Sequence, residues 1–201
     1  MEYLVTMTTL VPDKTTDEAV EQMRSREAAR ARELAAQGNL LRLWRPPLQP
    51  GEWRTIGLFA ANDEVELEKV LASMPLRVWR SDQVVVLGAH PNDPPPSHAG
   101  GGTDFLTTFT VTIPEDVDPA ELDRIKAGEA ERTRELAAQG NLVRLWMLAP
   151  TPASWRALGL WRAEDAEQLA AMLASLPMDK WMTTDPTQLS EHPSDPAAAA
   201  V

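Results

Sequence analysis

Two glutamates stand where an amphipathic helix would normally place aliphatic side chains. Glu27 and Glu129 each fall near the centre of an apolar stripe when neighbouring residues are spaced at about 100°. Ionising a carboxyl group in apolar surroundings is costly, so we expect the pKa of both groups to rise. A carboxyl group with a raised pKa can take up a proton near neutral pH and return it. The two stripes consist of Val20, Met23, Ala31 and Leu34 in the first half and Leu122, Ile125 and Leu136 in the second.

A structural role is the alternative for both glutamates. Each has a cation three residues before it, Arg24 or Lys126, and an arginine three residues after it, Arg30 or Arg132. Side chains at this spacing on a helix can pair, which would keep the carboxylate ionised. Structural ion pairs also perturb pKa values, so the helix alone leaves both interpretations open.

An arginine and a tryptophan share one face of the strand that follows each long helix. Alternation along the strand places Arg42 beside Trp44, and the second half repeats them as Arg144 and Trp146. Such a pair can bind a carboxylate-bearing, partly apolar ligand through a bidentate ion pair and stacking. The same pair can equally be an exposed arginine lying over a tryptophan as a surface cation–π contact.

Other patterns of catalysis and metal binding are missing from the sequence. It contains no HExxH motif, no G-x-S-x-G motif and no cysteine. The glycines at 100–102 lie in a linker and do not follow a strand, so they do not predict a phosphate-binding loop. His90 and His192 each precede a proline, and one histidine in each half does not make a metal site. We therefore expect no metal.

Charge and hydropathy exclude two classes of partner. The formal net charge of −11 argues against nucleic acid and anionic membranes, because both select a basic patch. No stretch approaches the roughly 18 apolar residues of a membrane span. The N-terminal sequence MEYLVTMTTLVP lacks the basic and apolar regions of a signal peptide. We expect a cytoplasmic protein.

The chain repeats itself at a constant offset of 102 residues. The segments 32–44 and 134–146 differ at a single position, Leu41 against Val143. An offset that holds over most of each half predicts one domain fold present twice. Two domains of about 100 residues each could bury a further face against each other, as an internal pseudo-dimer.

Each copy predicts the element order βαββαβ, a signature of the ferredoxin-like fold. The expected fold class is therefore α+β, with two such domains forming a pseudo-dimer of the dimeric α+β barrel type. Expected strands are 3–9, 40–45, 53–60 and 78–87, then 104–113, 141–148, 154–162 and 181–189; expected helices are 17–37, 63–73, 118–139 and 164–175. Expected domains are 1–91 and 104–193, with a Pro/Gly-rich linker at 92–103 and a disordered tail at 194–201.

Several short motifs follow the same order in both copies. In the first copy they are Met7-Thr8 with Pro12, Arg24 with Glu27, Gly38 to Arg45, Met74-Pro75 and His90-Pro91-Asn92. In the second copy they are Lys126 with Glu129, Gly140 to Trp146, Leu176-Pro177 and His192-Pro193-Ser194. In this order and spacing, each copy resembles muconolactone delta-isomerase, a small ferredoxin-like enzyme family of aromatic catabolism.

The resemblance implies a cofactor-independent isomerase that moves a double bond in a small unsaturated lactone or similar carboxylate-bearing ring. It implies that Glu27 and Glu129 move the proton, and it implies no cofactor and a homo-oligomer. The residues expected to orient the anion and line the pocket are Arg24, Lys126, Arg42, Arg144, Trp44 and Trp146.

This sequence departs from the family pattern in two places. Arg24 stands where the family has lysine, and Met147 stands where it usually has arginine after the tryptophan. Fusion of two copies frees each to diverge, and a fold does not fix a reaction. A cyclase or cofactor-free oxygenase of a natural-product pathway, or a non-catalytic module that binds small acids, are the alternatives.

Overall fold

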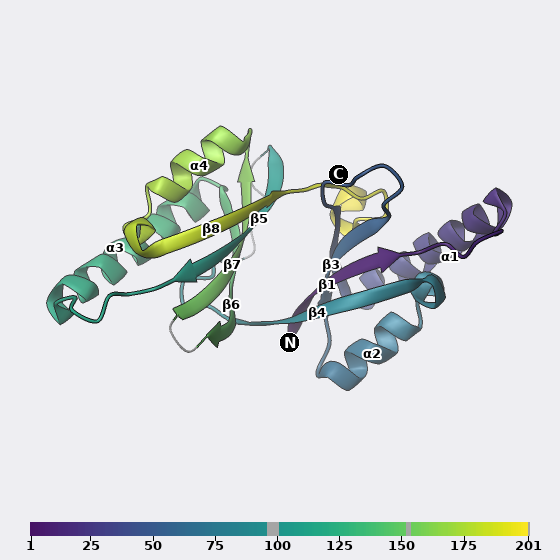
Figure 1. The fold of residues 1–201 in the computed structure, drawn as a ribbon, viewed down its shortest axis with the longest axis horizontal. Helices are drawn as coiled ribbons and strands as arrows, with labels where there is room; N and C mark the ends of the chain where they lie inside the picture. The colour runs from purple at the N-terminus through teal and green to yellow at the C-terminus, as the bar shows by residue number, and fades with distance from the viewer. Residues whose placement is uncertain (96–100, 152–153, 201) are drawn as a thin grey trace. The chain divides into compact units, whose positions relative to one another are not determined.

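A computed structural model describes residues 1–95, 101–151 and 154–200. It divides the chain into two compact units (Figure 1). The first unit is Met1–Leu87 with Ser190–Val201, and the second is Gly88–Leu189. Each unit contains one copy of the βαββαβ order, which confirms the expected α+β class with two ferredoxin-like units.

The first unit is an antiparallel sheet in the order β4-β1-β3-β2-β9. β1 pairs with both neighbours, Val5 lying opposite Gly57 of β3 and Val84 of β4. β2 and β3 form an antiparallel hairpin. The elements are β1 (Glu2–Thr9), α1 (Asp17–Ala36), β2 (Leu40–Arg45), β3 (Arg54–Ala60), α2 (Glu64–Ala72), a 3-10 helix (Pro75–Trp79), β4 (Arg80–Ala89) and, from the end of the chain, β9 (Ser190–Glu191) and a 3-10 helix (Pro196–Ala200).

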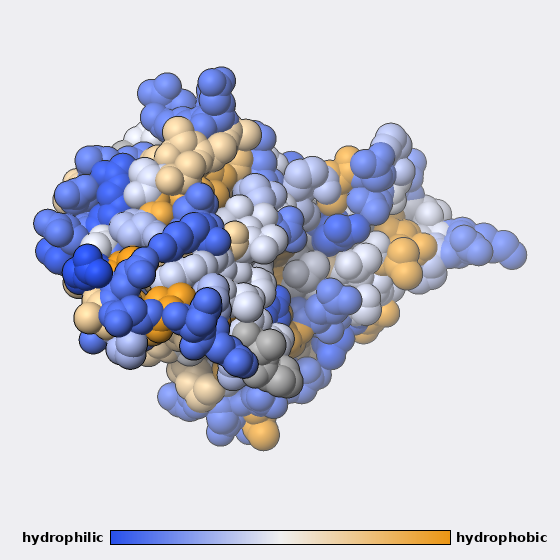
Figure 2. All heavy atoms as spheres, turned by 60° about the vertical axis from the view of Figure 1, so that its left-hand side comes forward, coloured by the Kyte–Doolittle hydropathy of each residue, from blue (hydrophilic) through white to orange (hydrophobic). Residues whose placement is uncertain are grey.

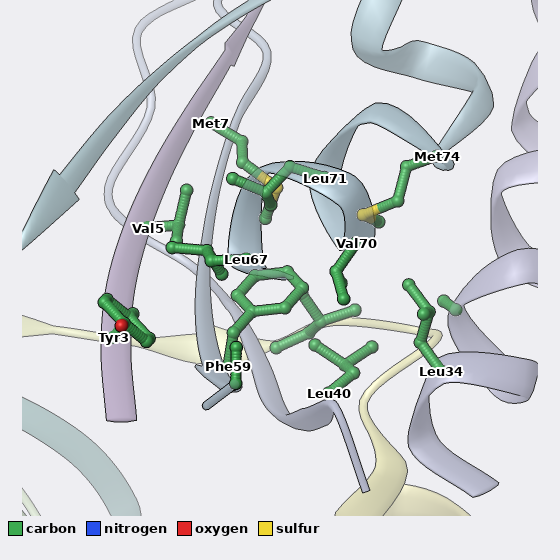
Figure 3. Packing of buried hydrophobic residues seen from close by; sticks show 13 residues of the cluster. Tyr3, Val5, Met7, Leu34, Leu40, Phe59, Leu67, Val70, Leu71 and Met74 are labelled. Atoms are coloured by element: carbon green, nitrogen blue, oxygen red, sulfur yellow. The ribbon is translucent and has the colours of Figure 1, made fainter. Parts of the chain in front are cut away.

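Alternation along β1 decides which face of this sheet is buried. Tyr3, Val5 and Met7 are all at most 4% exposed, because they face α1 and α2. Leu34 from α1 and Leu71 from α2 complete the same apolar cluster (Figure 3). Both helices therefore cover one face of the sheet, and the apolar stripe of α1 faces the strands.

The ends of α1 fix the position of that stripe. Thr16 accepts a hydrogen bond from the Ala19 N–H at 3.2 Å and begins the helix. Gly38 has φ +77°, and the N–H groups of Gly38 and Asn39 close a Schellman motif onto Ala35 and Leu34. The chain then turns directly into β2, which begins at Leu40.

The second unit repeats this plan with the sheet order β8-β5-β7-β6-β4, in which β4 contributes only Gly88 and Ala89. Its long helix ends at the same glycine position, Gly140, with φ +80°. The elements are β5 (Thr103–Val111), α3 (Pro119–Ala138), β6 (Leu142–Thr151), β7 (Ser154–Ala163), α4 (Ala166–Ala174), a 3-10 helix (Asp179–Trp181) and β8 (Met182–Gln188). Strand β8 forms with Pro186 in it, opposite Thr107 at the edge of the sheet.

The last residues of each copy belong to the unit built mainly from the other copy. These exchanged segments begin at Gly88 in the first copy and at Ser190 in the second. Ser190 pairs with Arg45 of β2, and Gly88 pairs with Met147 of β6. The structure thus divides the chain differently from the expected domains 1–91 and 104–193.

Of the expected linker 92–103, residues 96–100 lie outside the described residues. The tail expected to be disordered, 194–201, contains the buried Asp195 and a 3-10 helix in its described part.

Two aspartates explain why these segments are held. The Asp195 carboxylate accepts hydrogen bonds from the Leu43 N–H at 3.0 Å and from the Arg42 guanidinium at 3.1 Å. Asp93 accepts the same pair of bonds in the second unit, from the Leu145 N–H at 2.7 Å and from Arg144. A charge-assisted contact of this kind orders a segment that composition alone predicts to be loose.

Much of the surface is hydrophilic (Figure 2). Figure 2 shows a face on which hydrophilic side chains predominate and hydrophobic side chains form scattered groups. Among the described residues, the longest helices are too polar to cross a bilayer, and no candidate membrane span is found.

Replacing Asp195 tests whether this contact holds the exchanged segment. The Asp195 side chain is fully buried, so Asp195→Ala should lower the free energy of unfolding by about 3–5 kcal/mol, measured by urea denaturation. Asp93→Ala is the matched control. Its side chain is 25% exposed, so water screens the pair and the loss should be smaller. Equal losses would contradict the burial difference.

Candidate functional site

A cavity lies against the long helix of each unit. The first has a volume of about 560 Å³ and the second about 590 Å³. Glu27 lines the first cavity and Glu129 the second, so each cavity contains one of the two glutamates found in the apolar stripes. The exchanged segment lines each cavity with a His-Pro pair, His192-Pro193 in the first unit and His90-Pro91 in the second.

Glu27 is held by two hydrogen bonds. Its Oε2 accepts from the Leu76 N–H at 2.8 Å, and its Oε1 accepts from the Arg80 guanidinium at 2.9 Å. The side chain is 14% exposed. Burial raises the pKa of Glu27, while the Leu76 N–H and Arg80 oppose that shift. This carboxylate is therefore the partner of a buried cation.

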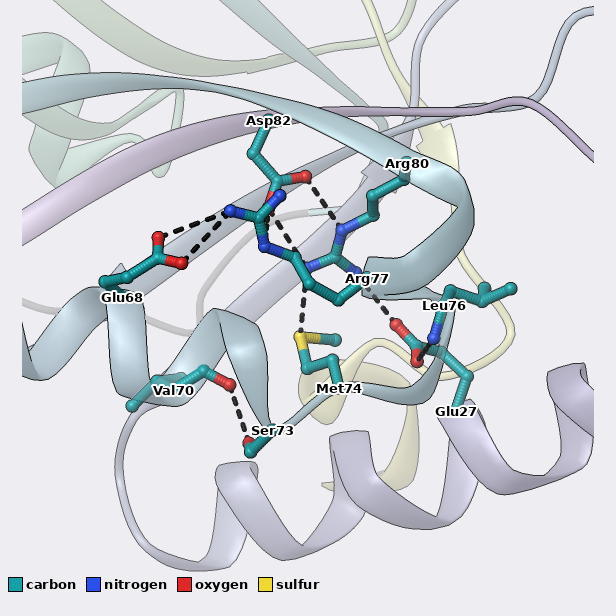
Figure 4. Close-up of polar contacts among 9 residues, drawn as sticks. All are labelled: Glu27, Glu68, Val70, Ser73, Met74, Leu76, Arg77, Arg80 and Asp82. Atoms are coloured by element: carbon teal, nitrogen blue, oxygen red, sulfur yellow. Dashed lines mark hydrogen bonds and ion pairs between the residues drawn. The ribbon is translucent and has the colours of Figure 1, made fainter.

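Arg80 belongs to a polar network of the first unit (Figure 4). Its side chain is 2% exposed and pairs also with Asp82 at 2.8 Å. Arg77 lies between Asp82, at 3.5 Å, and Glu68, at 3.1 Å. Glu27 is thus at one end of a chain of alternating charges. Each carboxylate of this chain faces a guanidinium, so the buried charges compensate one another.

Glu129 has simpler surroundings. Its Oε2 accepts a hydrogen bond from the Met178 N–H at 3.0 Å. Met182 occupies the position that corresponds to Arg80, so no arginine faces the carboxylate at that point. Burial raises the pKa of Glu129, the Met178 N–H opposes the shift, and the nearby Asp179 adds to it. This environment favours the protonated form more directly than that of Glu27.

Apolar side chains dominate the second cavity. Its polar and charged lining residues are His90, Asn92, Lys126, Glu129 and Thr133. An apolar cavity with a few polar groups is typical of a small-molecule binding site. The apolar lining residues include Phe109, Ile113, Leu145, Met147, Trp155, Trp161 and Met182.

The histidines of the His-Pro pairs lie in the cavities, although their sequence pattern indicated no role beyond the exclusion of a metal site. Nδ1 of His90 accepts the Asn92 N–H at 3.1 Å, and Nδ1 of His192 accepts the Ser194 N–H at 3.1 Å. Burial lowers the pKa of His90, and burial with Arg45 lowers the pKa of His192 to about 4. Both rings are neutral at pH 7, with the proton on Nε2. Their recurrence at the end of each copy was the available signal.

The structure separates the predicted cations into two groups. Lys126 lines the second cavity and Arg24 lines the first, where its guanidinium lies 4.5 Å from the Trp53 ring centroid. Neither Arg24 nor Lys126 forms an ion pair with its own glutamate among the described residues. Arg24 contacts Glu21 instead, at 3.8 Å.

The predicted arginine–tryptophan pairs lie outside the two cavities. Arg42 stacks over Trp44 at 4.7 Å, and Arg144 stacks over Trp146 at 4.8 Å. Both guanidinium groups are also bound by the aspartates of the exchanged segments. The tryptophans are 1% and 2% exposed. These four residues hold the segments that bring the histidines to the cavities.

No group of three or more His, Asp or Glu side chains in the described part of the chain is arranged to hold a metal ion. Glu27 and His192 both line the first cavity, and Glu129 and His90 both line the second. These pairs can perform proton transfer and hydrogen bonding.

Comparison with known proteins gives a consistent family. The family description of muconolactone delta-isomerase matches residues 1–93 and again residues 104–195. The muconolactone delta-isomerase of Pseudomonas aeruginosa is 32% identical to this chain over 90 residues. Those residues are 45% of this chain and 91% of that enzyme. The enzyme of Rhodococcus opacus is 28% identical over 91 residues, which are 45% of this chain and 95% of that enzyme.

Solved structures agree on the fold. The structure of a heme-binding protein from Thermus thermophilus superposes with a TM-score of 0.56 and 13% sequence identity. The match covers 95% of this chain and 91% of the heme-binding protein. A mutant chlorite dismutase from Candidatus Nitrospira defluvii superposes with a TM-score of 0.58 and 11% sequence identity. The match covers 94% of this chain and 91% of the dismutase chain. At these identities the likeness shows the α+β fold alone.

Acid titration tests the environment of His192. Folded His192 binds a proton only near pH 4, whereas the unfolded chain binds one near 6.5. The unfolded state therefore binds more protons between these values, and stability falls as pH drops through this range. His192→Asn keeps an acceptor for the Ser194 N–H, so it should lose less stability on acidification, measured by thermal unfolding from pH 7 to 4. An unchanged acid profile would contradict a buried neutral ring.

Stability measurements on Glu129→Gln distinguish a proton-transfer role from a structural one. The raised pKa means that folded Glu129 keeps its proton above 4.5, so its ionisation costs stability as pH rises. Glutamine still accepts the Met178 N–H, so the variant should melt higher than wild type at pH 7, and this gain should vanish near pH 4. Glu27→Gln is the matched control and should show no such gain, because Glu27 also neutralises Arg80. A lower melting temperature for Glu129→Gln would favour the structural role.

Proposed function

This chain belongs to the muconolactone delta-isomerase family, with two copies of the family's domain, and from this membership we propose that it is a cofactor-independent isomerase. Its substrate is a small unsaturated lactone that bears a carboxylate, or a similar ring, and the reaction moves a double bond by proton transfer. The observation that supports the proposal is Glu129, a carboxyl group with a raised pKa in an apolar cavity of about 590 Å³.

The reaction begins when the Glu129 carboxylate removes a proton from the substrate. This proton comes from the ring carbon to which the carboxylate-bearing substituent of the lactone is attached. The electron pair moves through the double bond, and negative charge develops on the lactone carbonyl oxygen. Protonated Glu129 then returns the proton to the carbon beside the carbonyl, so no electrons are gained or lost overall. One residue can serve both steps because its pKa lies closer to neutrality than that of an ordinary carboxyl group.

Two further groups of the second cavity suit this reaction. The Lys126 ammonium is the cation among the residues that line it, and it is suited to bind the carboxylate of the substrate. Nε2–H of neutral His90 can donate a hydrogen bond to the developing enolate oxygen, since its Nδ1 already accepts the Asn92 N–H. Arg144 and Trp146 do not enter the proposal, because Asp93 already binds Arg144.

Glu27 is the corresponding residue of the first unit and is less suited to the same chemistry. Its carboxylate already accepts a hydrogen bond from Arg80. Taking up a substrate proton would break that ion pair and leave Asp82 as the remaining carboxylate against the buried guanidinium. We therefore assign most of the turnover to Glu129. Arg24 and Arg42 belong to the first unit, so we assign them no part in this turnover.

Substitution of the two glutamates tests this assignment. Glu129→Gln should lower kcat for muconolactone by roughly 10²–10⁴-fold, the usual contribution of a general acid–base group. Glu27→Gln is the matched control and should keep the larger part of the turnover. Reaction in deuterated water, followed by NMR, adds a second readout, because a proton exchanged on glutamate would bring solvent deuterium into the product. Unchanged turnover in the double variant would rule out this mechanism.

A further inference from the structure

The two cavities differ in charge at equivalent positions. Arg45 of the first cavity corresponds to Met147 of the second, and Arg80 corresponds to Met182. Because the two cavities share one fold, this difference comes from the side chains alone. Duplication has thus given one chain an apolar version and a cationic version of the same cavity.

Two of the four arginines in the first cavity are neutralised by close ion pairs. Four arginines line it, Arg24, Arg45, Arg54 and Arg80. Arg80 is paired with Glu27, as described above, and Arg54 lies 3.1 Å from Glu52. His192 adds no charge, since its pKa of about 4 keeps the ring neutral at pH 7. The remaining positive charge is that of Arg24 and Arg45.

Arg45 differs from the other three. No hydrogen bond or ion pair joins its guanidinium to any residue in the described ranges, yet its charge reaches the cavity, where it helps to keep His192 neutral. Arg24 has only a long contact with Glu21, at 3.8 Å, and lies over the Trp53 ring. A planar guanidinium with unused N–H groups is the side chain best suited to bind a carboxylate in two places.

We propose that the cavity of the first unit is a binding site for a small organic carboxylate, held by Arg45 and Arg24 beside Trp53, and that it does not isomerise this ligand. The first half of the proposal stands on the geometry of the first unit. The second half rests on the proposed function, because it assigns turnover to the other cavity.

The ion pair of Glu27 is the physical reason for binding without turnover. A bound carboxylate would meet Arg45 and Arg24, but the carboxylate that should remove its proton is engaged by Arg80 and by the Leu76 N–H. The second cavity has the opposite arrangement, with an available base in Glu129 and a single lining cation in Lys126. The ligand of the first cavity belongs to the same chemical class as the substrate, a small ring with an anionic side chain.

Equivalent tryptophans give each cavity its own reporter. Trp53 lines the first cavity and Trp155 lines the second. The probe is the saturated analogue of muconolactone, which has no double bond to move. Titration of the full chain with this probe, followed by the indole N–H signals in ¹H–¹⁵N NMR spectra, should shift both tryptophans with separate dissociation constants.

Charge variants assign each response to its cavity. Arg45→Met introduces the residue that the second cavity has at this position, and it should weaken the Trp53 response by roughly 10–100-fold, as expected for loss of a charged hydrogen-bond donor. Lys126→Met is the matched control and should weaken the Trp155 response alone. Arg45→Lys keeps the charge and should restore part of the affinity, which separates ligand binding from a folding defect.

Three results would overturn the proposal. The Trp53 signal could stay unmoved by the probe while Trp155 responds, Arg45→Met could titrate like wild type, or Glu129→Gln could keep half of the turnover. The expected result is that Glu129→Gln loses turnover and keeps the Trp53 response. A wild-type chain that binds the probe at Trp53 but never isomerises muconolactone would contradict the proposed function and leave this binding site standing.

Discussion

A carboxylate held away from water, against one backbone N–H group, is the interaction on which both halves of this protein depend. The donor in each unit is the residue that follows the proline after the second helix, Leu76 or Met178. In both units burial outweighs the hydrogen bonds that the carboxylate accepts, so its pKa rises. The long helix, the second helix and the turn after it are thereby tied to one polar contact inside apolar surroundings.

What surrounds that contact determines how the carboxylate can be used. In the first unit a buried arginine approaches it, and a network of alternating charges, continuing through Asp82, fixes the arginine. In the second unit a methionine, Met182, stands at that position. One difference between equivalent positions therefore decides whether the glutamate has a buried arginine as its partner, although both glutamates accept a hydrogen bond from equivalent backbone N–H groups.

Each cavity also depends on a segment that comes from the other copy. Asp195 binds a backbone N–H and an arginine of β2 in the first unit, and Asp93 does the same on β6 in the second. These contacts bring His192 and His90 to the cavities. The arginines predicted to bind substrate, Arg42 and Arg144, hold these aspartates instead. Fusion of the copies makes such an exchange possible within one chain.

Periodicity and repetition were enough to predict the two ferredoxin-like units, the long helices and the position of both glutamates, because these depend on local spacing. Helix ends were predictable for the same reason, since Gly38 and Gly140 adopt a conformation that glycine favours. The partners Arg80, Asp195 and Asp93 were not predictable, because each meets its counterpart across 52 or more residues of sequence. Local sequence determines which side chains face inward. Tertiary packing alone decides which of them meet, and so which of the two glutamates is paired with a buried arginine.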